Sequence, residues 1–533
     1  MIVACLAIVL ILLPALTYSQ SLTISGSVLD KEENPLPGVN VLIQGTAQGT
    51  ITDIEGQYQI QAEADDVLIY SFVGYAAQEV PVNNRSTINV TLAEDAAQLD
   101  EIVVVGYGTE KKVNLSGAVD YVDAEVIENR PISNISQGLQ GVIPNLNVDF
   151  LSGEPGAAAN INIRGLTSIN GGDPLILIDG VPSDPVELNR ISPQDIENIS
   201  VIKDASAAAI YGARASFGVI LITTKMGDEQ GVNVSYTNNF SWDRPTIVPD
   251  KITDPYIYLR LRETSTDNTP WDNQNYTDEM YQFARDRSND PSIPAVRRNP
   301  LDDSQWEYMG NRDWNNYFLT ENSFSQNHSL SIDGASEKAR YFISGNYNRQ
   351  NGVLAIDDDY FDRYSFRTKV DYDVADWFTV GNNTFLTNTV REQPTGLSFW
   401  DIYNLHPTDW HVNPDGTWAN SGAGRLAAEM VDGGNTTEKY NSLQSRFTAQ
   451  LSFWDNMLKV NADYTYRRGN TNYNYYTTKY NIGFGPDDIR EEGQNYAYRR
   501  ARFEDYNVFN VYSTFAKDFG IHDLTAIVGF NQE

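Results

Sequence analysis

Long stretches of alternating apolar and polar residues fill the second half of the chain. Around position 370, Phe366, Val370 and Tyr372 fall on one face, while Arg367 and Lys369 fall on the other. Similar alternation predicts nine strands, at about 231–242, 326–334, 339–349, 361–374, 377–390, 441–454, 457–468, 502–516 and 523–532. Because successive side chains of a strand point to opposite faces, each strand has one apolar and one polar face.

The connections between these strands alternate in length. Tight turns such as Asp455-Asn456 join every second pair, whereas 243–325, 391–440 and 469–501 are long and 350–360 is intermediate. Short turns at one rim and long loops at the other are typical of a transmembrane β-barrel. A soluble sandwich also alternates, but its connections are usually short at both ends.

The number of predicted strands indicates whether they make up a whole barrel. Bacterial barrels have an even number of strands, and barrels with an internal plug have about 22. A ninth strand would leave edges unpaired, and unpaired edges are not viable in lipid. We therefore expect a truncated chain, in which residues 229–533 form the first part of a transmembrane β-barrel.

The long loops are rich in Asn, Asp, Trp and Tyr. Examples are Thr269–Asn273 and Trp410–Trp418. Aromatic rings stack on the apolar faces of sugars, and amides and carboxylates bind hydroxyl groups, so this composition suits carbohydrate. For any single residue, ordinary loop composition explains the pattern equally well.

Residues 20–93 differ from the later part of the chain in having short apolar runs between turn signals. The runs are Leu22–Leu29, Val39–Ile43, Tyr58–Ile60, Val67–Val73 and Thr87–Leu92. Short strands with a turn roughly every 8–12 residues are typical of a β-sandwich.

Residues 110–228 mix helical and strand signals. Leu175–Ile178 is a fully apolar strand before the turn pair Asp179-Gly180, Asp204–Tyr211 is Ala-rich and predicted to be a helix ending at Gly212, and Val219–Thr224 is a β-branched strand. An α+β domain with buried strands is the expected result. Its charged residues favour ionic contacts with a polar barrel wall over catalysis; they are Arg164, Asp179, Lys203, Asp204, Arg214 and Lys225.

The N-terminus is predicted to be an export signal. Residues 2–16 are almost wholly apolar and too short to cross a bilayer comfortably, and Thr17 and Ser19 are small residues before a cut at Gln20. The usual basic region is missing, and a buried core helix is the alternative. Removal of residues 1–19 would remove Cys5, the sole cysteine, so the mature chain would have no disulfide or thiolate site.

Composition excludes two classes of protein. Subtracting 71 acidic residues from 38 Lys and Arg gives a net charge of −33, which argues against a nucleic-acid partner. After the N-terminus no apolar run is long enough for a membrane helix. Together with the strand pattern, this predicts a mainly β fold: an N-terminal β-sandwich, an α+β domain, which the resemblance described below identifies as a plug domain, and part of a barrel.

A short β-branched run, 101–105, follows the polar linker 94–100 and precedes Gly106-Tyr107-Gly108. A dinucleotide-binding loop would need Gly at 111, which is Lys111, and no helical pattern follows. The favoured interpretation is a mobile strand whose unpaired backbone recruits a partner strand. An ordinary strand of the next domain is the alternative.

Two resemblances to known families rest on specific motifs. Residues 22–93, with Pro37-Gly38-Val39 and Asp53-Ile54-Glu55-Gly56, resemble the carboxypeptidase regulatory-like domain, and they contain no His that could bind zinc. Further motifs are Leu99–Thr109, Arg164–Ser168, Pro174–Pro182, Ile191–Ile199, Val201–Ala215 and Gly218–Lys225. These are similar to the junction and plug of SusC-like (RagA-like) TonB-dependent outer-membrane transporters. Phe217 departs from the family, which usually has a small polar residue there.

The resemblance implies an importer of bulky nutrients in the outer membrane of a Gram-negative cell. It assigns TonB binding to Asp100, Glu101, Ile102, Val103, Val104, Val105 and Gly106. It further implies TonB with ExbB and ExbD as the energy supply, a SusD-like surface lipoprotein, outer-membrane lipid and an oligosaccharide substrate, without cofactors. A peptide importer of the same architecture and a siderophore or cobalamin receptor are the alternatives. The expected domains are 1–19, 20–93, 94–109, 110–228 and 229–533.

An enzyme would need a catalytic constellation, which the sequence does not offer. His328, His406, His411 and His522 are scattered, and the spacing of His406 and His411 matches no zinc motif. Asp357-Asp358-Asp359 could bind Ca²⁺ but lacks EF-hand spacing, so a solvated loop is favoured. We expect no catalytic activity and no metal.

Overall fold

The structure is a computed structural model of the 533-residue chain. It describes Leu22 to Glu533 except for 32–33, 45, 47, 73–74, 94–101, 106–107, 112–118, 129, 131, 133, 151, 166–171, 205–207, 228–229, 272 and 520–522. The predicted signal peptide therefore lies outside the described residues. The chain divides into two compact units, one of Met1–Val105 with Thr109–Ser116 and the other of Gly106–Gly108 with Gly117–Glu533.

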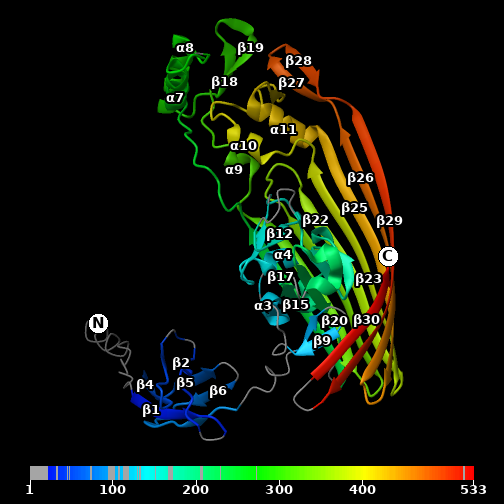
Figure 1. Ribbon diagram of the computed structural model, residues 1–533. Helices are drawn as coiled ribbons and strands as arrows, with labels where there is room; N and C mark the ends of the chain where they lie inside the picture. The colour runs from blue at the N-terminus through cyan, green and yellow to red at the C-terminus, as the bar shows by residue number, and fades with distance from the viewer. Residues whose placement is uncertain are drawn as a thin grey trace, which may run out of the picture. The chain divides into compact units, whose positions relative to one another are not determined.

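The first unit contains the predicted β-sandwich (Figure 1). One sheet has the order β4-β1-β7 and the other β3-β2-β5-β6. The strands are β1 (Leu22–Leu29), β2 (Asn40–Ile43), β3 (Gly49–Ile51), β4 (Gln57–Ala62), β5 (Val67–Phe72), β6 (Tyr75–Pro81) and β7 (Val90–Thr91). Ile24, Val41 and Leu68 are fully buried in its core. The sequence did not predict β3 and β6, because neither shows clear alternation.

The second unit contains a mixed α/β segment, residues 119–227, which we call the plug. Its five-stranded sheet has the order β10-β15-β16-β13-β14, and β13 and β16 pair in parallel. The elements are β10 (Val119–Asp123), α3 (Ala124–Glu128), α4 (Ile135–Leu139), β11 (Leu146–Asp149), β12 (Asn160–Ile163), β13 (Leu175–Ile178), β14 (Val181–Ser183), α5 (Pro185–Leu188), η2 (Pro193–Asp195), β15 (Ile196–Ile202), η3 (Ala209–Ala215) and β16 (Val219–Thr224). Ile176 and Ile220 are fully buried, as expected for parallel strands covered on both faces.

The predicted helix Asp204–Tyr211 is described only in part, because residues 205–207 lie outside the described residues. Ala208 is α-helical and its N–H donates to Asp204 O at 3.0 Å, whereas η3, a 3₁₀ helix, begins at Ala209. Gly212 has φ 68° and ψ −156°, a non-helical conformation that ends the run 209–211 at the predicted position and separates it from Ala213–Ala215.

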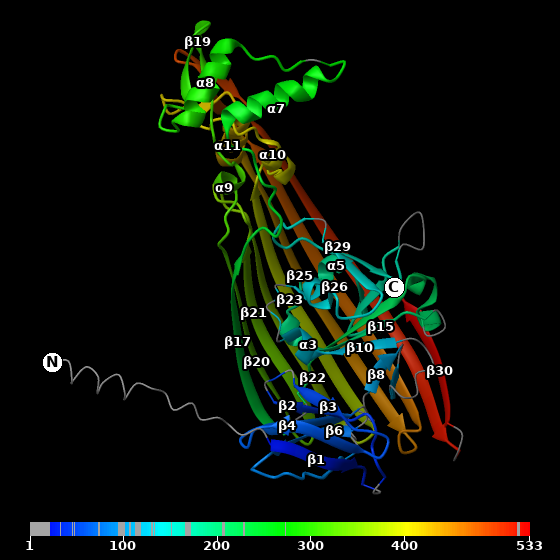
Figure 2. The same cartoon turned by 90° about the vertical axis from the view of Figure 1, so that its left-hand side faces the viewer.

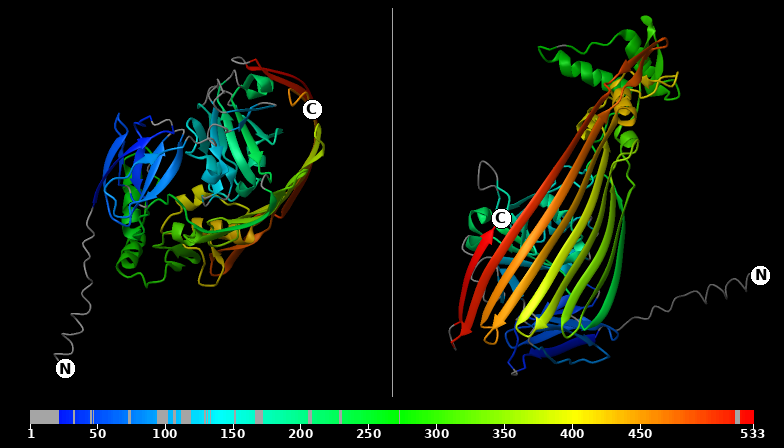
Figure 3. Two further views of the ribbon diagram at one scale, coloured as in Figure 1. Left: turned by 90° about the horizontal axis from the view of Figure 1, so that it is seen from below. Right: turned by 90° about the vertical axis from the view of Figure 1, so that its right-hand side faces the viewer.

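The second unit also contains a nine-stranded antiparallel sheet, which we call the wall (Figure 3). Its order is β17-β20-β21-β22-β23-β25-β26-β29-β30. The strands are β17 (Gly231–Asp243), β20 (Ser323–Ala335), β21 (Ala339–Asn351), β22 (Tyr360–Ala375), β23 (Phe378–Pro394), β25 (Gly434–Phe453), β26 (Leu458–Thr477), β29 (Tyr496–Asp518) and β30 (Asp523–Gln532). All nine predicted strands are confirmed, and several are longer than predicted.

The wall curves, and the plug lies on its concave side (Figure 3, left). Along β22 the side chains of Arg363 and Arg367, 0% and 1% exposed, face the plug. Those of Tyr364 and Phe366 face outward and are 49% and 44% exposed. The sequence predicted this alternation, and the structure shows that the polar face is the inner one.

The long connections contain secondary structure of their own, gathered beyond one end of the wall strands (Figure 2). They hold α7 (Pro255–Asp267), α8 (Asp278–Asn289), β18 (Val296–Asn299), β19 (Asp302–Tyr308), α9 (Asn315–Phe318), α10 (Phe399–Asn404), β24 (Trp418–Ala419), α11 (Gly422–Asp432), β27 (Tyr480–Gly485) and β28 (Asp488–Glu492). From the sequence they were expected to be loops, and their helices were not predicted. Across the described residues, no helix is both long and apolar enough to cross a membrane.

Candidate functional site: the interface between plug and wall

The turn between β13 and β14 places Asp179 against the wall. Asp179 and Gly180 have φ of 47° and 80°, as expected for the Asp-Gly pair of a tight hairpin turn. The carboxylate accepts hydrogen bonds from Thr224 of the plug at 2.9 and 2.6 Å, through N–H and Oγ1. From the wall, Asn383 Nδ2 donates to it at 2.7 Å.

Three basic side chains of the wall surround this turn. Arg367 Nη1 lies 3.4 Å from Asp179 Oδ2, and Lys369 Nζ lies 3.6 Å from Oδ1. Arg446 donates to the main-chain carbonyl of Asp179. Burial by itself raises the pKa of Asp179, but Lys369, Arg367 and the Thr224 hydrogen bonds outweigh it and lower the pKa to about 2. Asp179 is therefore ionised at neutral pH.

A second buried carboxylate, Asp195 of η2, contacts the same arginine. Asn346 Nδ2 of β21 lies 3.2 Å from both oxygens of Asp195, and Arg367 Nε lies 3.7 Å from Oδ2. Asp195 is 0% exposed and Arg367 is 1% exposed. Arg367 thus lies between two plug carboxylates, which is the arrangement that makes a buried charge tolerable.

Arg363, four residues before Arg367, contacts plug backbone instead of a carboxylate. Its Nη1 donates to Asn189 O at 2.7 Å and to Ile191 O at 3.2 Å. Asn189 caps the C-terminus of α5, where main-chain carbonyls lack helical partners and favour a cation. The wall therefore binds the plug through main chain as well as through charged side chains.

Apolar and aromatic contacts complete the interface. Phe385 of β23 is 6% exposed and belongs to the hydrophobic core of the plug. Tyr440 OH donates to Glu187 at 2.6 Å, and the Arg190 guanidinium lies 3.3 Å from the Tyr440 ring centroid. These contacts extend the interface from the charged turn to α5.

The predicted ionic role holds for only some of the charged plug residues. Asp179 contacts the wall as expected, and Arg214 pairs with Glu533, just after β30. Lys203 and Lys225 instead pair within the plug, with Asp120 and Glu128 respectively. Their partners come from β10 and α3, so a prediction of wall contacts from charge alone was wrong for these two lysines. Asp195 was missed; its position inside the family-typical block Ile191–Ile199 was the available signal.

The predicted TonB-binding segment is described only in part. Ile102–Val105 form β8, which pairs with β9 (Gly108–Lys111) in a two-stranded sheet. Asp100, Glu101 and Gly106 lie outside the described residues. Within the described part of the chain, β8 has a strand partner on one edge, so the expectation of a wholly unpaired strand does not hold. Its other edge has no partner strand among those residues.

The aromatic loop residues divide into half-buried and exposed ones. Trp410 and His411 pack with Trp314 and Tyr317, and the His411 and Tyr317 ring centroids are 4.6 Å apart. Burial, with Arg312 nearby, lowers the pKa of His411 to about 4. Trp271, by contrast, is 75% exposed. Trp410 and His411 thus hold the loops together, whereas Trp271 is free to meet a ligand.

No group of acidic, His or Cys residues with the geometry of a metal site occurs in the described residues. Asp359 is 4% exposed, so the interpretation of Asp357–Asp359 as a solvated loop was wrong for this residue. Its Oδ1 accepts the Leu354 N–H at 3.3 Å. The acidic run therefore contributes to the packing of the 350–360 connection.

Comparison with known proteins agrees with this architecture. The TonB-dependent Receptor Plug Domain family matches residues 111–219, and the CarboxypepD_reg-like domain family matches residues 24–104. TonB-dependent receptor P3 of Formosa agariphila is 31% identical over 98% of this chain and 49% of its own length. TonB-dependent receptor SusC of Bacteroides thetaiotaomicron is 30% identical over 96% of this chain and 53% of its own length. The chain belongs to the SusC-like TonB-dependent receptors.

The SusC-like fold is also found in solved structures. The RagAB peptide transporter superposes with a TM-score of 0.58 and 21% identity, over 78% of this chain and 48% of that one. The SusC-like chain described here spans about half the length of the relatives it matches. Its relatives are receptors and transporters, not enzymes.

Proposed function

We propose that this chain is part of an outer-membrane transporter that imports a bulky nutrient with energy from TonB. The observation that carries the proposal is a plug held by buried ionic contacts on the polar face of a sheet whose other face is apolar. A sheet of this kind separates lipid from a polar lumen, and the plug closes that lumen. Export by the signal peptide 1–19 is part of the same proposal.

The outward face of the wall supports insertion in a bilayer. Exposed apolar and aromatic residues run along β22 from Tyr364 to Val374, ten residues further on, which is ~33 Å of strand. For a strand tilted by about 40°, this covers ~25 Å, the height of the apolar band of outer-membrane barrels. The polar residues Asn382, Thr384 and Ser445 interrupt the band but hydrogen-bond one another at 2.8 to 3.1 Å, so their polar groups are paired without water.

TonB would act through β8. A partner strand can pair with the edge of β8 that has no strand partner among the described residues, because main-chain pairing depends little on side-chain identity. A pull on this strand would then be transmitted along the chain to the plug, which begins a few residues later at β10. The energy would come from the inner-membrane potential, roughly 2.3 kcal/mol per charge per 100 mV.

An oligosaccharide is the substrate class that we propose. The long connections expose Trp271 and Trp400, each 75% exposed, and aromatic rings stack on sugar faces. A cavity of about 480 Å³ in the same region is lined by Trp418, Tyr480 and Asp432 among others. Peptides are the second candidate, because the RagAB neighbour is a peptide transporter. By the SusC-type resemblance we also propose a SusD-like surface lipoprotein as a partner.

Growth and uptake assays test the proposal. A deletion strain complemented with the native gene is grown on single polysaccharides and on peptide mixtures as carbon source. We expect loss of growth on at least one polysaccharide, and restoration that depends on TonB. If growth is lost on peptides but not on any polysaccharide, the substrate is a peptide and not an oligosaccharide. Uptake that persists in a strain without TonB would contradict the transport mechanism itself.

A further inference from the structure

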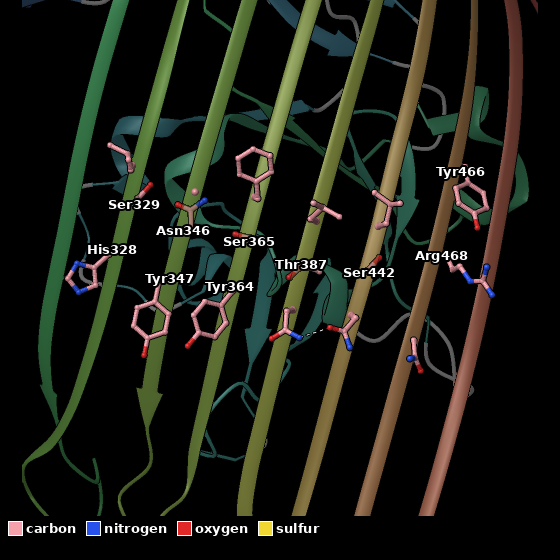
Figure 4. Close-up of a pocket in the computed structure, with 18 of the residues that line it drawn as sticks. His328, Ser329, Asn346, Tyr347, Tyr364, Ser365, Thr387, Ser442, Tyr466 and Arg468 are labelled. Carbon is pink, nitrogen blue, oxygen red and sulfur yellow. Dashed lines mark hydrogen bonds between the residues drawn. The ribbon is translucent and has the colours of Figure 1, made fainter.

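A groove of about 1040 Å³ lies on the wall and is lined by residues of seven neighbouring strands, from β17 to β26, and by one residue of β29 (Figure 4). Its outward-facing residues form two cross-strand rows. One row is apolar and the other is aromatic and polar. The groove is separate from the interface with the plug, because the side chains of these two rows alternate with those that contact the plug.

Leucine and phenylalanine side chains form the floor of the groove. In register across the strands lie Leu330, Gly345, Phe366, Leu386 and Leu443. Leu330 and Phe366 are 48% and 44% exposed. A Cβ at Gly345 would meet no atom within 4 Å, so this glycine leaves an open notch between two exposed apolar side chains.

The row next to the floor, two residues along each strand, is aromatic on one side and carries amides on the other. The rings of His328 and Tyr347 stack with centroids 6.3 Å apart, and those of Tyr347 and Tyr364 with centroids 4.8 Å apart (Figure 4). On the next two strands the Asn388 amide donates to Asn441. Phenol, imidazole and amide groups are hydrogen-bonding partners for hydroxyl groups.

The apolar band of the wall shows at which level of the membrane the groove lies. Below Phe366 the outward residues of β22 include Val370, Tyr372 and Val374, while the aromatic and amide row lies toward the long connections. Amphipathic rings concentrate at the boundary between hydrocarbon and headgroups. The groove therefore crosses this boundary, with an apolar floor on the hydrocarbon side and polar groups on the headgroup side.

One exposed cation lies at the end of the floor row. Arg468 is next to Leu443 in register, and its side chain is 59% exposed. It lies 3.5 Å from Asp505, an exposed pair that contributes little to stability. Because an arginine side chain is long enough to reach from the hydrocarbon side of the groove to the headgroups, it can bind a phosphate there, for which guanidinium geometry is well suited.

We propose that this groove binds a phosphorylated, acylated saccharide lipid of the outer leaflet, that is, a lipid of the lipopolysaccharide class. One acyl chain lies in the notch at Gly345, along Leu330 and Phe366. The sugar hydroxyls contact the row of Tyr347, Tyr364, Asn388 and Asn441, and a phosphate reaches Arg468. The inference rests on the proposed function, because it requires the wall to stand in an outer membrane.

Lipid analysis of the purified protein tests the site. The full-length protein is extracted from outer membranes in mild detergent, and lipid that remains bound is identified and counted by native mass spectrometry. Gly345→Phe fills the notch, and Asn441→Ala removes one headgroup contact. Val370→Phe is the matched control, since it adds the same ring to the outward face of β22 below the groove.

We expect retained lipopolysaccharide on the wild-type protein and on Val370→Phe, at least a fivefold loss with Gly345→Phe, and a smaller loss with Asn441→Ala. Equal retention by all variants would overturn the site, and retention of phospholipid instead would overturn the headgroup assignment. If the wild-type protein is absent from the outer membrane, the proposed function has failed. If it is present and imports nutrient but holds no lipid, only this inference has failed.

Discussion

At the scale of residues, Asp179 places one buried carboxylate between Arg367 and Lys369 of the wall. Asp179→Asn keeps the shape of the side chain but leaves Lys369 without its carboxylate partner and Arg367 with Asp195 alone. Breaking a buried ion pair in this way costs about 3 to 5 kcal/mol. We expect faster amide exchange in β13 and β14 and increased sensitivity of cells to a large antibiotic that enters through an unplugged pore.

The control for this prediction is Asp376→Asn, because Asp376 is exposed in the turn between β22 and β23. It removes the same charge away from the plug and should change neither measurement. Unchanged exchange in Asp179→Asn would mean that the hydrogen bonds of Thr224 and Asn383 hold the plug without the charge.

Asp359 makes the 350–360 connection sensitive to pH. Burial raises the pKa of this carboxyl to about 6, above its ordinary value of 3.8, and the residue lies outside the apolar band. A raised folded-state pKa contributes stability that is complete below pH ~4 and is lost as the pH rises through 6. Asp359→Asn should therefore stabilise this connection at pH 8 by about 3 kcal/mol and have little effect at pH 4.

Amide exchange of Leu354, whose N–H bonds to Asp359, measures this difference at pH 4, 6 and 8 after correction for intrinsic rates. A wild-type protein whose protection does not change between pH 4 and 8 would contradict the prediction.

At the scale of elements, β8 is the strand that we expect TonB to pair with. Val103→Pro or Val104→Pro removes one main-chain donor from the ladder. We expect uptake to be abolished while substrate binding at the cell surface stays unchanged, because the long connections are not altered. Val103→Thr keeps both the donor and the β-branched side chain and should import normally. Normal uptake by the proline variants would refute the assignment of this strand.

The helices of the long connections depend on capping. The Asp254 carboxylate accepts the Ile257 N–H at 2.8 Å at the start of α7, and Ser288 of α8 donates to it at 3.0 Å. Asp254→Ala should destabilise this helix pair by about 1 kcal/mol, whereas Asp254→Asn should retain most of the cap. Hydrogen exchange of α7 distinguishes the two variants, and equal protection would show that packing alone holds the helix.

At the scale of the whole molecule, the proposal requires an outward face that meets lipid. Val370 is 39% exposed near the middle of the apolar band. An arginine at this depth costs about 2 to 4 kcal/mol in a barrel. We expect Val370→Arg to lower the amount of protein assembled in the outer membrane, measured by heat-modified mobility of membrane fractions. Glu337→Arg, in an exposed turn, is the control, and equal assembly of both variants would argue against a lipid-facing wall.

The sequence by itself determined the strands of the wall and of the sandwich. Period-two alternation is a local property, so positions such as Phe366 and Arg367 reveal opposite faces without any knowledge of neighbours. The Asp179-Gly180 turn was equally visible, because two successive left-handed residues favour that pair.

Only the tertiary structure decided which charges meet across the interface and which apolar residues form the lipid groove. Lys203 and Lys225 resemble Asp179 as charged plug residues, yet they pair within the plug, because strand order and not composition brings Asp120 and Glu128 beside them. Gly345 becomes a notch only because pairing places Leu330 and Phe366 on either side of it. Such contacts join residues far apart in the chain, and a local pattern carries no information about them.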